Sequence, residues 1–273
     1  MRMDSVDVLC CPACKGNLQL TAENRNEVEI ADGTLDCSEC KRQFDIDEGL
    51  PNLIFPDTLE ESDLQNKIYH DQHPDYSSRR WALRLGIWIA LWDTRARRHL
   101  IDKLELKKNA SLLETGVGTG ANLFIIANLI GKYHRLDGID ISLETLKVAR
   151  RKMKAAGIHV ELACGNAAWL PYRDERYDGV LHVGALNQIG DKKRAIEEMV
   201  RVSKPGAKVI MCDEGLAPGK ENTWHGRWIL RRDPVLFANK PPVEFLPGGI
   251  RDLRVYWVWQ KTFWVIEFRK QEP

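Results

Sequence analysis

The sequence has little of what marks a membrane-spanning, secreted or dedicated nucleic-acid-binding protein. Its 273 residues carry a net charge of +1, so no chain-wide basic field attracts nucleic acid, although a local patch is compatible with this balance. The longest apolar stretch, residues 81–92, spans about 12 residues and contains Arg84, which is too short for a bilayer span. The first ten residues lack the apolar core of a signal peptide. We therefore expect a cytoplasmic protein without a transmembrane segment.

Cysteine is scarce, but its few copies are clustered near the start of the chain. There are 7 cysteines, too few for a disulfide scaffold of this length, and two C-x2-C pairs stand 22 residues apart. Four thiolates at this spacing converge tetrahedrally on Zn²⁺, and such a site has no open position for chemistry. The sequence predicts a structural zinc ribbon over residues 1–55, with Cys10 outside the metal site. The predicted zinc ligands are Cys11, Cys14, Cys37 and Cys40.

From residue 111 onward, strand-like and helix-like segments alternate. This pattern predicts an α/β domain over residues 111–273, with a doubly wound, mostly parallel seven-stranded sheet and helices on both faces. Two late β-rich runs form a hairpin that adds antiparallel pairing at one edge. Residues 56–110 are expected to be a linker, with a loop over 56–75, followed by N-terminal helices that form a lid or substrate region. The expected strands are 111–117, 135–141, 159–166, 177–184, 207–214, 252–259 and 262–270, and the expected helices are 79–106, 121–130, 142–157 and 191–204.

A glycine-rich turn, ETGVGTG, lies between the first of these strands and its helix. Glycines there let the backbone approach a ligand closely and place amides at a helix N-terminus. Asp140 ends the next strand, 26 residues after Glu114, where an acid suits the hydroxyls of a ribose. Asn166 ends the third strand, and its amide can hydrogen-bond an adenine edge. Because open α/β sheets bind ligands at the carboxyl ends of their strands, these residues predict a nucleoside-containing cofactor.

Two classes of cofactor fit the glycines. Gly116, Gly118 and Ala121 also satisfy the G-x-G-x-x-A pattern of dinucleotide-binding proteins. The carboxylate of Glu114, however, would repel a pyrophosphate, and it suits a cofactor with a cationic amino-acid end. The acid two residues before the first glycine therefore disfavours a dinucleotide.

Residues 111–215 resemble class I S-adenosylmethionine-dependent methyltransferases, of the broad type that includes the ubiquinone/menaquinone methyltransferases. The resemblance is carried, in this order, by ETGVGTG, LDGIDIS, GNAAWLPYRDERYDGVLHVGALNQI and AIEEMVRVSKPGAKVIMCDE. It implies a Rossmann-like transferase that moves a methyl group directly, in line, from S-adenosyl-L-methionine. Asn166 stands where Asp is commoner, and Ala207 replaces the second glycine of the usual turn. The residues that the resemblance places against the cofactor are Glu114, Gly116, Gly118, Gly120, Asp140, Ile141, Asn166, Ala167 and Val183.

The N-terminal segments LCCPACKGNLQL and LDCSECKRQFDIDEGLPNLI resemble the zinc ribbon that is fused to, or partners with, several methyltransferases. One such group methylates a guanine in large-subunit ribosomal RNA, so this second resemblance implies RNA as an alternative substrate. The ribbon would then grip the RNA. The ribbon's charge is mixed in sign, which weakens that alternative.

The methyl acceptor is less determined than the cofactor. The quinone-type resemblance, the Trp-rich segments and the near-neutral charge favour a small-molecule or lipid-like acceptor, including an aromatic one. The absence of an N/D-P-P-Y/F tetrapeptide after the fourth strand disfavours methylation of an exocyclic base amine. A non-catalytic subunit that binds the cofactor and supports another protein is a third hypothesis. The sequence does not indicate the oligomeric state.

The residues that follow the fourth and fifth strands are expected to face the transferred methyl group. By residue type His182 is the strongest candidate base, although a satisfied core histidine fits its strand position equally well. Asn187 is the second catalytic candidate. Arg95, Arg97 and Arg98 are interpreted as a solvated helix face. The nine tryptophans fit core packing, a wall for a large apolar substrate, or peripheral contact with a membrane surface.

Overall fold

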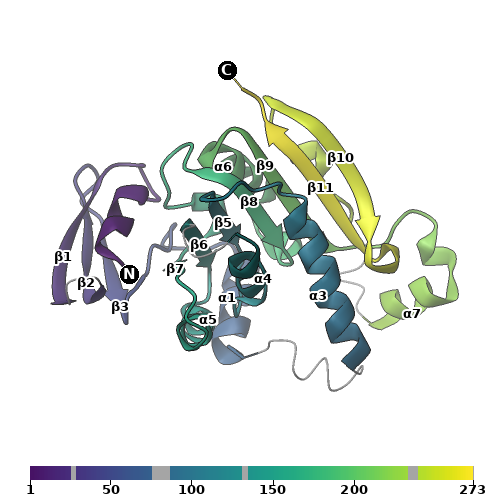
Figure 1. The fold of residues 1–273 in the computed structure, drawn as a ribbon, viewed down its shortest axis with the longest axis horizontal. Coiled ribbons are helices and arrows are strands. Elements are labelled where there is room, and N and C mark those ends of the chain that lie inside the picture. Colours follow the sequence, from purple (N-terminus) through teal and green to yellow (C-terminus); the bar gives the residue numbers. More distant parts are fainter. Residues whose placement is uncertain (26–28, 76–86, 131–134, 233–238, 273) are drawn as a thin grey trace.

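The computed structural model describes residues 1–273 except 26–28, 76–86, 131–134, 233–238 and 273, and it contains two sheets (Figure 1). The smaller sheet is antiparallel, in the order β1-β2-β3-β4, and the larger is seven-stranded, in the order β10-β11-β9-β8-β5-β6-β7. The larger sheet confirms the predicted doubly wound fold. Its strands are β5 (Ser111–Thr115), β6 (Arg135–Asp140), β7 (Glu161–Cys164), β8 (Tyr177–Val183), β9 (Ser203–Glu214), β10 (Ile250–Val258) and β11 (Phe263–Lys270). Those of the smaller sheet are β1 (Leu18–Arg25), β2 (Ile30–Cys37), β3 (Gln43–Asp47) and β4 (Leu50–Pro51).

Helices connect the strands of the larger sheet and cover its faces. None of the helices within the described ranges is both long and apolar enough to span a bilayer. The α-helices are α1 (Glu61–Gln72), α3 (Ile87–Asp102), α4 (Ala121–Ile130), α5 (Leu143–Ala155), α6 (Lys192–Val202) and α7 (Trp224–Arg232). The 3-10 helices are η1 (Met3–Val8), η2 (Ala167–Trp169), η3 (Leu186–Gln188), η4 (Lys220–Asn222), η5 (Val243–Phe245) and η6 (Trp259–Lys261).

The strand order reverses at β5. Strands β6 and β7 extend the sheet to one side of β5, while β8 and β9 extend it to the other, all in parallel. Strand β11 then pairs antiparallel with β9, and β10 pairs antiparallel with β11. In open α/β sheets, ligands bind in the crevice outside the carboxyl ends of the strands that flank such a reversal. The predicted cofactor residues on β5, β6 and β8 therefore lie at the same end of the sheet, where these parallel strands have their carboxyl ends.

Each face of the larger sheet is covered by its own hydrophobic cluster. Successive side chains of a strand point to opposite faces, so Leu112 packs in the cluster that contains Leu123 and Met153, whereas Leu113 packs in the one that contains Met199. The first cluster lies under α3, α4 and α5, and the second under α6. Burial on both faces explains why these parallel strands read as continuous apolar runs.

The ribbon shares its core with the second of these faces. Leu9 and Leu35 belong to the same buried cluster as Leu113. The ribbon also pairs with the sheet edge, because the amide of Leu53 donates to the carbonyl of Cys164 over 2.7 Å. Figure 1 shows the ribbon beside β7, at the opposite end of the sheet from the β10–β11 hairpin. The ribbon thus covers a strand edge that would otherwise be open.

Three sequence predictions differ from the structure. Residues 56–75 contain the helix α1 rather than a loop; no glycine or proline interrupts residues 57–73, and polar contacts described below hold the helix in place. Helix α3 ends at Asp102 rather than near residue 106, and the start of the predicted helix lies outside the described residues. Strand β9 begins at Ser203, since the Pro205-Gly206 turn forms an irregularity within the strand.

Candidate functional site: a cofactor cleft and a four-cysteine cluster

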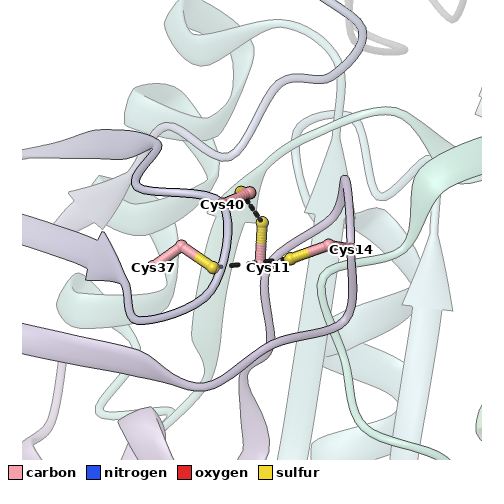
Figure 2. A group of neighbouring side chains, drawn as sticks. All are labelled: Cys11, Cys14, Cys37 and Cys40. Carbon is pink, nitrogen blue, oxygen red and sulfur yellow. Dashed lines mark hydrogen bonds between the residues drawn. The ribbon is translucent and has the colours of Figure 1, made fainter.

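The sulfur atoms of Cys11, Cys14, Cys37 and Cys40 form a compact cluster (Figure 2). All four lie within 4.8 Å of one another, with 3.6 Å between Cys11 and Cys40 and 3.5 Å between Cys14 and Cys37. A tetrahedral zinc ion with Zn–S bonds of about 2.3 Å requires sulfur–sulfur distances of about 3.8 Å. The four thiols therefore fit structural zinc. Cys10 is buried and outside the cluster, as predicted.

Each cysteine pair is held by a turn of the same type. The amide of Lys15 donates to the carbonyl of Cys11 over 2.8 Å, and the amide of Lys41 donates to that of Cys37 over 3.2 Å. Both lysines adopt left-handed backbone conformations, with φ of 60° and 62°. Each turn directs two thiols to the same point, so the spacing in the sequence determines the site.

The side chain of Glu114 is buried, and one of its carboxyl oxygens lacks a hydrogen-bond partner among the described residues. It lies on β5 and is 1% exposed. Its Oε1 accepts a hydrogen bond of 2.6 Å from Nδ2 of Asn122, but its Oε2 is buried and has no hydrogen-bond partner among the described residues. Burial raises the pKa of Glu114 to about 8, against the opposing effects of Asn122 and Arg97. A buried carboxylate oxygen of this kind calls for a cationic or hydrogen-bond-donating ligand.

The glycine turn is open at Gly118. Gly118 has φ of 52°, and a Cβ atom there would meet nothing within 4 Å. Its amide donates to Oδ2 of Asp140 over 2.8 Å, while Oδ1 of Asp140 accepts from the amide of Ser142 over 3.0 Å. Burial raises the pKa of Asp140, and these amide bonds oppose the rise. The turn and the acid at the end of β6 thus lie against each other, as the spacing predicts.

Helix α1 is bonded to the loops that follow β7 and β8. Both ends of the Asn166 side-chain amide are bonded within the protein, since Oδ1 accepts from the amide of Ala168 over 2.9 Å and Nδ2 donates to Oδ2 of Asp63 over 3.1 Å. Asp63 is 4% exposed, and its Oδ1 accepts from the amide of Gly190 over 3.0 Å. Its carboxylate links the loops after β7 and β8. Asp63 was not predicted from the sequence; the stretch without glycine or proline around it indicates a helix but not this contact.

The remaining predicted cofactor residues lie at strand ends and turns of the same edge. Ile141 follows β6, Ala167 begins η2, and Val183 ends β8; all three are partly exposed. Gly116 lies over His182, with its ideal Cβ 3.3 Å from Cε1 of the imidazole. Gly120, with φ of 85°, starts the turn into α4 against Met153. The structure brings all nine predicted residues to the carboxyl ends of β5, β6, β7 and β8 or to the turns that follow them.

The two catalytic candidates have partners within the protein. His182 is 1% exposed, and its Nδ1 is 2.8 Å from Oγ1 of Thr115. Its Nε2 finds no partner in the described part of the chain, and burial lowers its pKa to about 4, so the ring is neutral at pH 7. Asn187 donates from its amide to Asp213 over 2.6 Å and from Nδ2 to the carbonyl of Glu214 over 2.8 Å. The roles of His182 and Asn187 in methyl transfer stay predictions.

Arg97, which lies outside the predicted glycine motif, contacts the partner of Glu114. Its Nη1 donates to Oδ1 of Asn122 over 3.0 Å, and Asn122 in turn donates to Glu114. Arg95 and Arg98 are exposed, in agreement with the predicted solvated face. Arg97 instead orients the Asn122 amide so that its nitrogen faces the carboxylate. Its spacing gave no sign of this role, because the contact depends on the docking of α3 against α4.

The seven-stranded sheet has the Rossmann-like fold of methyltransferases, and an N-terminal ribbon with a four-cysteine cluster precedes it. Residues 112–206 match the family described as methyltransferase domain, and residues 6–49 match the family described as Trm112p-like protein. The chain is 35% identical over 118 residues to demethylmenaquinone methyltransferase of Bacillus cytotoxicus, a match covering 43% of this chain and 50% of that protein. The chain thus spans about half the length of such curated relatives.

Two solved structures support the fold. The cyclase SpnF is 18% identical, with a TM-score of 0.55 over 66% of this chain and 81% of that one. A complex of the Trm112 methyltransferase activator of Haloferax volcanii with a methyltransferase described as putative is 16% identical, with a TM-score of 0.52 over 71% of this chain and 95% of that one. At these identities the likeness concerns the fold alone.

Proposed function

We propose that the chain transfers a methyl group from S-adenosylmethionine to a small or lipid-like acceptor with an electron-rich aromatic ring. The observation that carries the cofactor part is the buried Glu114 carboxyl group, whose Oε2 lacks a partner among the described residues. A cationic α-amino group would satisfy that oxygen in its ionised form.

Each end of the cofactor has a candidate holder. Glu114 would bind the amino group of the methionine part, and Asp140 would bind the ribose hydroxyls after rearranging its bonds to Gly118 and Ser142. Ile141, Ala167 and Val183 would line the adenine and the floor of the cleft. A bound S-adenosylmethionine supplies an electrophilic methyl group on a positively charged sulfur. The task of the protein is then alignment of the acceptor and exclusion of water.

The acceptor is proposed from the curated relatives. The similarity to demethylmenaquinone methyltransferase at 35% identity supports a ring carbon of a reduced quinone as the nucleophile. In that reaction the new carbon–methyl bond forms as the sulfur–methyl bond breaks, and the ring carbon releases its proton. His182 is proposed as the base because its ring is neutral and its Nε2 has no partner among the residues described here.

Calorimetric titration with S-adenosylhomocysteine, with NAD(H) as the control, tests the cofactor. We expect micromolar binding of S-adenosylhomocysteine alone and its loss in Asp140→Ala. Binding of NAD(H) instead would refute the proposal. Methyl transfer from isotope-labelled S-adenosylmethionine is then measured with a reduced, short-chain demethylmenaquinone analogue and, in parallel, with ribosomal RNA fragments. Labelling of the RNA alone would replace the quinone-like acceptor with the RNA alternative, which the Trm112p-like match over residues 6–49 leaves open.

A further inference from the structure

Helix α7 presents tryptophan and arginine, rather than small polar residues, on its outward face. Trp224 is 76% exposed and Trp228 is 44% exposed. Arg227 and Arg231 are exposed as well. These four positions follow the i, i+3, i+4, i+7 spacing of one helical face. An exposed tryptophan pair costs solvation free energy, so its place on a helix that could have buried it needs a reason.

The inward face of α7 is firmly attached, so this orientation is fixed. Oγ1 of Thr223 caps the helix by accepting from the amide of Gly226 over 3.0 Å. An ideal Cβ at Gly226 would lie 1.9 Å from the carbonyl oxygen of Lys220, so only glycine allows α7 to sit this close to η4. Ile229 is 8% exposed and points into the protein. Rotation of the helix to bury Trp224 would expose Ile229 and break the contact at Gly226.

The charge around the outward face is positive. Residues 219–231 contain three basic side chains, Lys220, Arg227 and Arg231, against one acidic side chain, Glu221. Within the described ranges, no ion pair involves Arg227 or Arg231. Tryptophan side chains are enriched at the headgroup level of a bilayer, and basic side chains near its surface are attracted to anionic lipid.

The position of α7 relates this face to the cleft. The helix follows β9 and lies beyond the carboxyl end of the sheet, and Figure 1 shows it below the β10–β11 hairpin, on the side where α1 lies. Helix α1 is bonded to the loops at the carboxyl ends of β7 and β8 through Asp63. A flat surface against α7 would therefore face the end of the sheet that carries the site.

We propose that the outward face of α7 docks the protein on an anionic lipid bilayer, with Trp224 and Trp228 in the headgroup region and Arg227 and Arg231 against lipid phosphates. The proposal goes beyond methyl transfer and does not depend on the identity of the acceptor. Its test therefore measures binding rather than activity.

Sedimentation of the zinc-loaded 273-residue chain with vesicles tests it. Vesicles of phosphatidylcholine with about one third phosphatidylglycerol are compared with vesicles of phosphatidylcholine alone. We expect binding to the anionic vesicles that weakens with salt. Trp224→Ala with Trp228→Ala should lower the partition coefficient by about tenfold. Arg227→Glu with Arg231→Glu should lower it by roughly 30-fold or more, since each cation near an anionic surface contributes on the order of 1 kcal/mol.

Matched control variants make the result specific to α7. Leu253→Ala with Val255→Ala removes a similarly exposed apolar pair on β10, and Lys107→Glu with Lys108→Glu makes the same charge change before β5, at the amino end of the sheet. Both should bind like the wild type. Unchanged thermal midpoints and S-adenosylhomocysteine affinities establish that all variants fold; if the tryptophan pair fails this check, the arginine pair carries the test.

Two results would overturn the proposal. In the first, the wild type does not sediment with anionic vesicles, or the α7 variants sediment as it does. In the second, a single-stranded RNA oligonucleotide competes the protein off the vesicles and itself loses affinity in the arginine variant, which would make α7 an RNA-binding face instead.

Discussion

In the ribbon, four cysteine thiols lie within 4.8 Å of one another and together complete a metal's coordination, whereas in the cleft Glu114 keeps one buried oxygen without a partner in the described part of the chain. The first site is closed, and its polar groups serve stability. The second holds a carboxyl group whose pKa burial raises to about 8, an arrangement that costs stability at neutral pH. We therefore expect substitution of the cysteines to unfold the protein, and substitution of Glu114 to weaken cofactor binding without unfolding it.

The largest effect is expected from removing zinc. Structural zinc contributes on the order of 10 kcal/mol of folding free energy, and the ribbon core is continuous with one face of the large sheet. A chelator or Cys37→Ser should therefore unfold the ribbon and lower the thermal midpoint of the whole chain, with loss of amide-exchange protection in β1 to β4. Cys10→Ser is the matched control, because Cys10 is buried beside the cluster but outside it. Equal zinc loss in Cys10→Ser would contradict the ligand assignment.

Glu114→Gln should act in the opposite direction on stability. A raised folded-state pKa gives stability that is fully present below the unfolded value and is lost as pH rises toward about 8. The glutamine does not titrate, so at pH 7 the apo variant should be more stable than the wild type by about 3 kcal/mol, with little difference at pH 4. Its affinity for S-adenosylhomocysteine should fall by about 100-fold, because a charged hydrogen bond is lost.

A second buried carboxyl group tests whether cofactor affinity depends on the position of Glu114 or only on the burial of a carboxyl group. Asp137 is 1% exposed on β6, and it is paired with Arg135 at 2.7 Å rather than left with a free oxygen. Asp137→Asn should destabilise the protein, since it leaves Arg135 without its counter-ion, yet it should keep S-adenosylhomocysteine affinity. Denaturant titration and calorimetry on both variants measure the two effects. Equal loss of affinity in the two variants would mean that Glu114 acts only through the fold.

The pH dependence of cofactor binding tests the role of Glu114 without a mutation. Binding of a cationic amino group requires the ionised form of Glu114, and the pKa of that group is about 8 in the free protein. S-adenosylhomocysteine affinity should therefore rise by roughly tenfold per pH unit between pH 6 and pH 8. Calorimetry across this range measures the slope. A flat profile in the wild type, or the same slope in Glu114→Gln, would assign the proton to another group.

The two sites also differ in how far they could be predicted from the sequence. The zinc cluster depends on two local turns, so the spacing of Cys11, Cys14, Cys37 and Cys40 was sufficient. Likewise Glu114 and Asp140 lie at the ends of adjacent parallel strands, and the period of the strand–helix pattern places them together. Asp63 and Arg97 could not be found in this way. They come from α1 and α3, whose docking on the site depends on tertiary contacts that no spacing in the sequence records.

The smallest effect is expected at a polar contact between the ribbon and helix α6. Nζ of Lys15 donates to Oε2 of Glu198 on α6 over 2.8 Å and to the carbonyl of Leu170 over 3.0 Å. Glu198 also receives two hydrogen bonds from Arg201, so Lys15→Met leaves its charge paired. The free energy of unfolding should therefore fall by only about 1 kcal/mol.

Lys41 offers a close internal control for this change. It occupies the equivalent left-handed position after the second cysteine pair, but among the described residues its Nζ donates only to the nearby carbonyl of Ser38, at the surface. Lys41→Met should therefore leave both zinc affinity and stability unchanged, as measured by denaturant titration of the zinc-loaded chain. A larger loss in Lys41→Met than in Lys15→Met would mean that the lysines support the metal turns themselves. The expected order, with the loss confined to Lys15→Met, would show that a residue of the metal turn has a second role in holding the ribbon against α6.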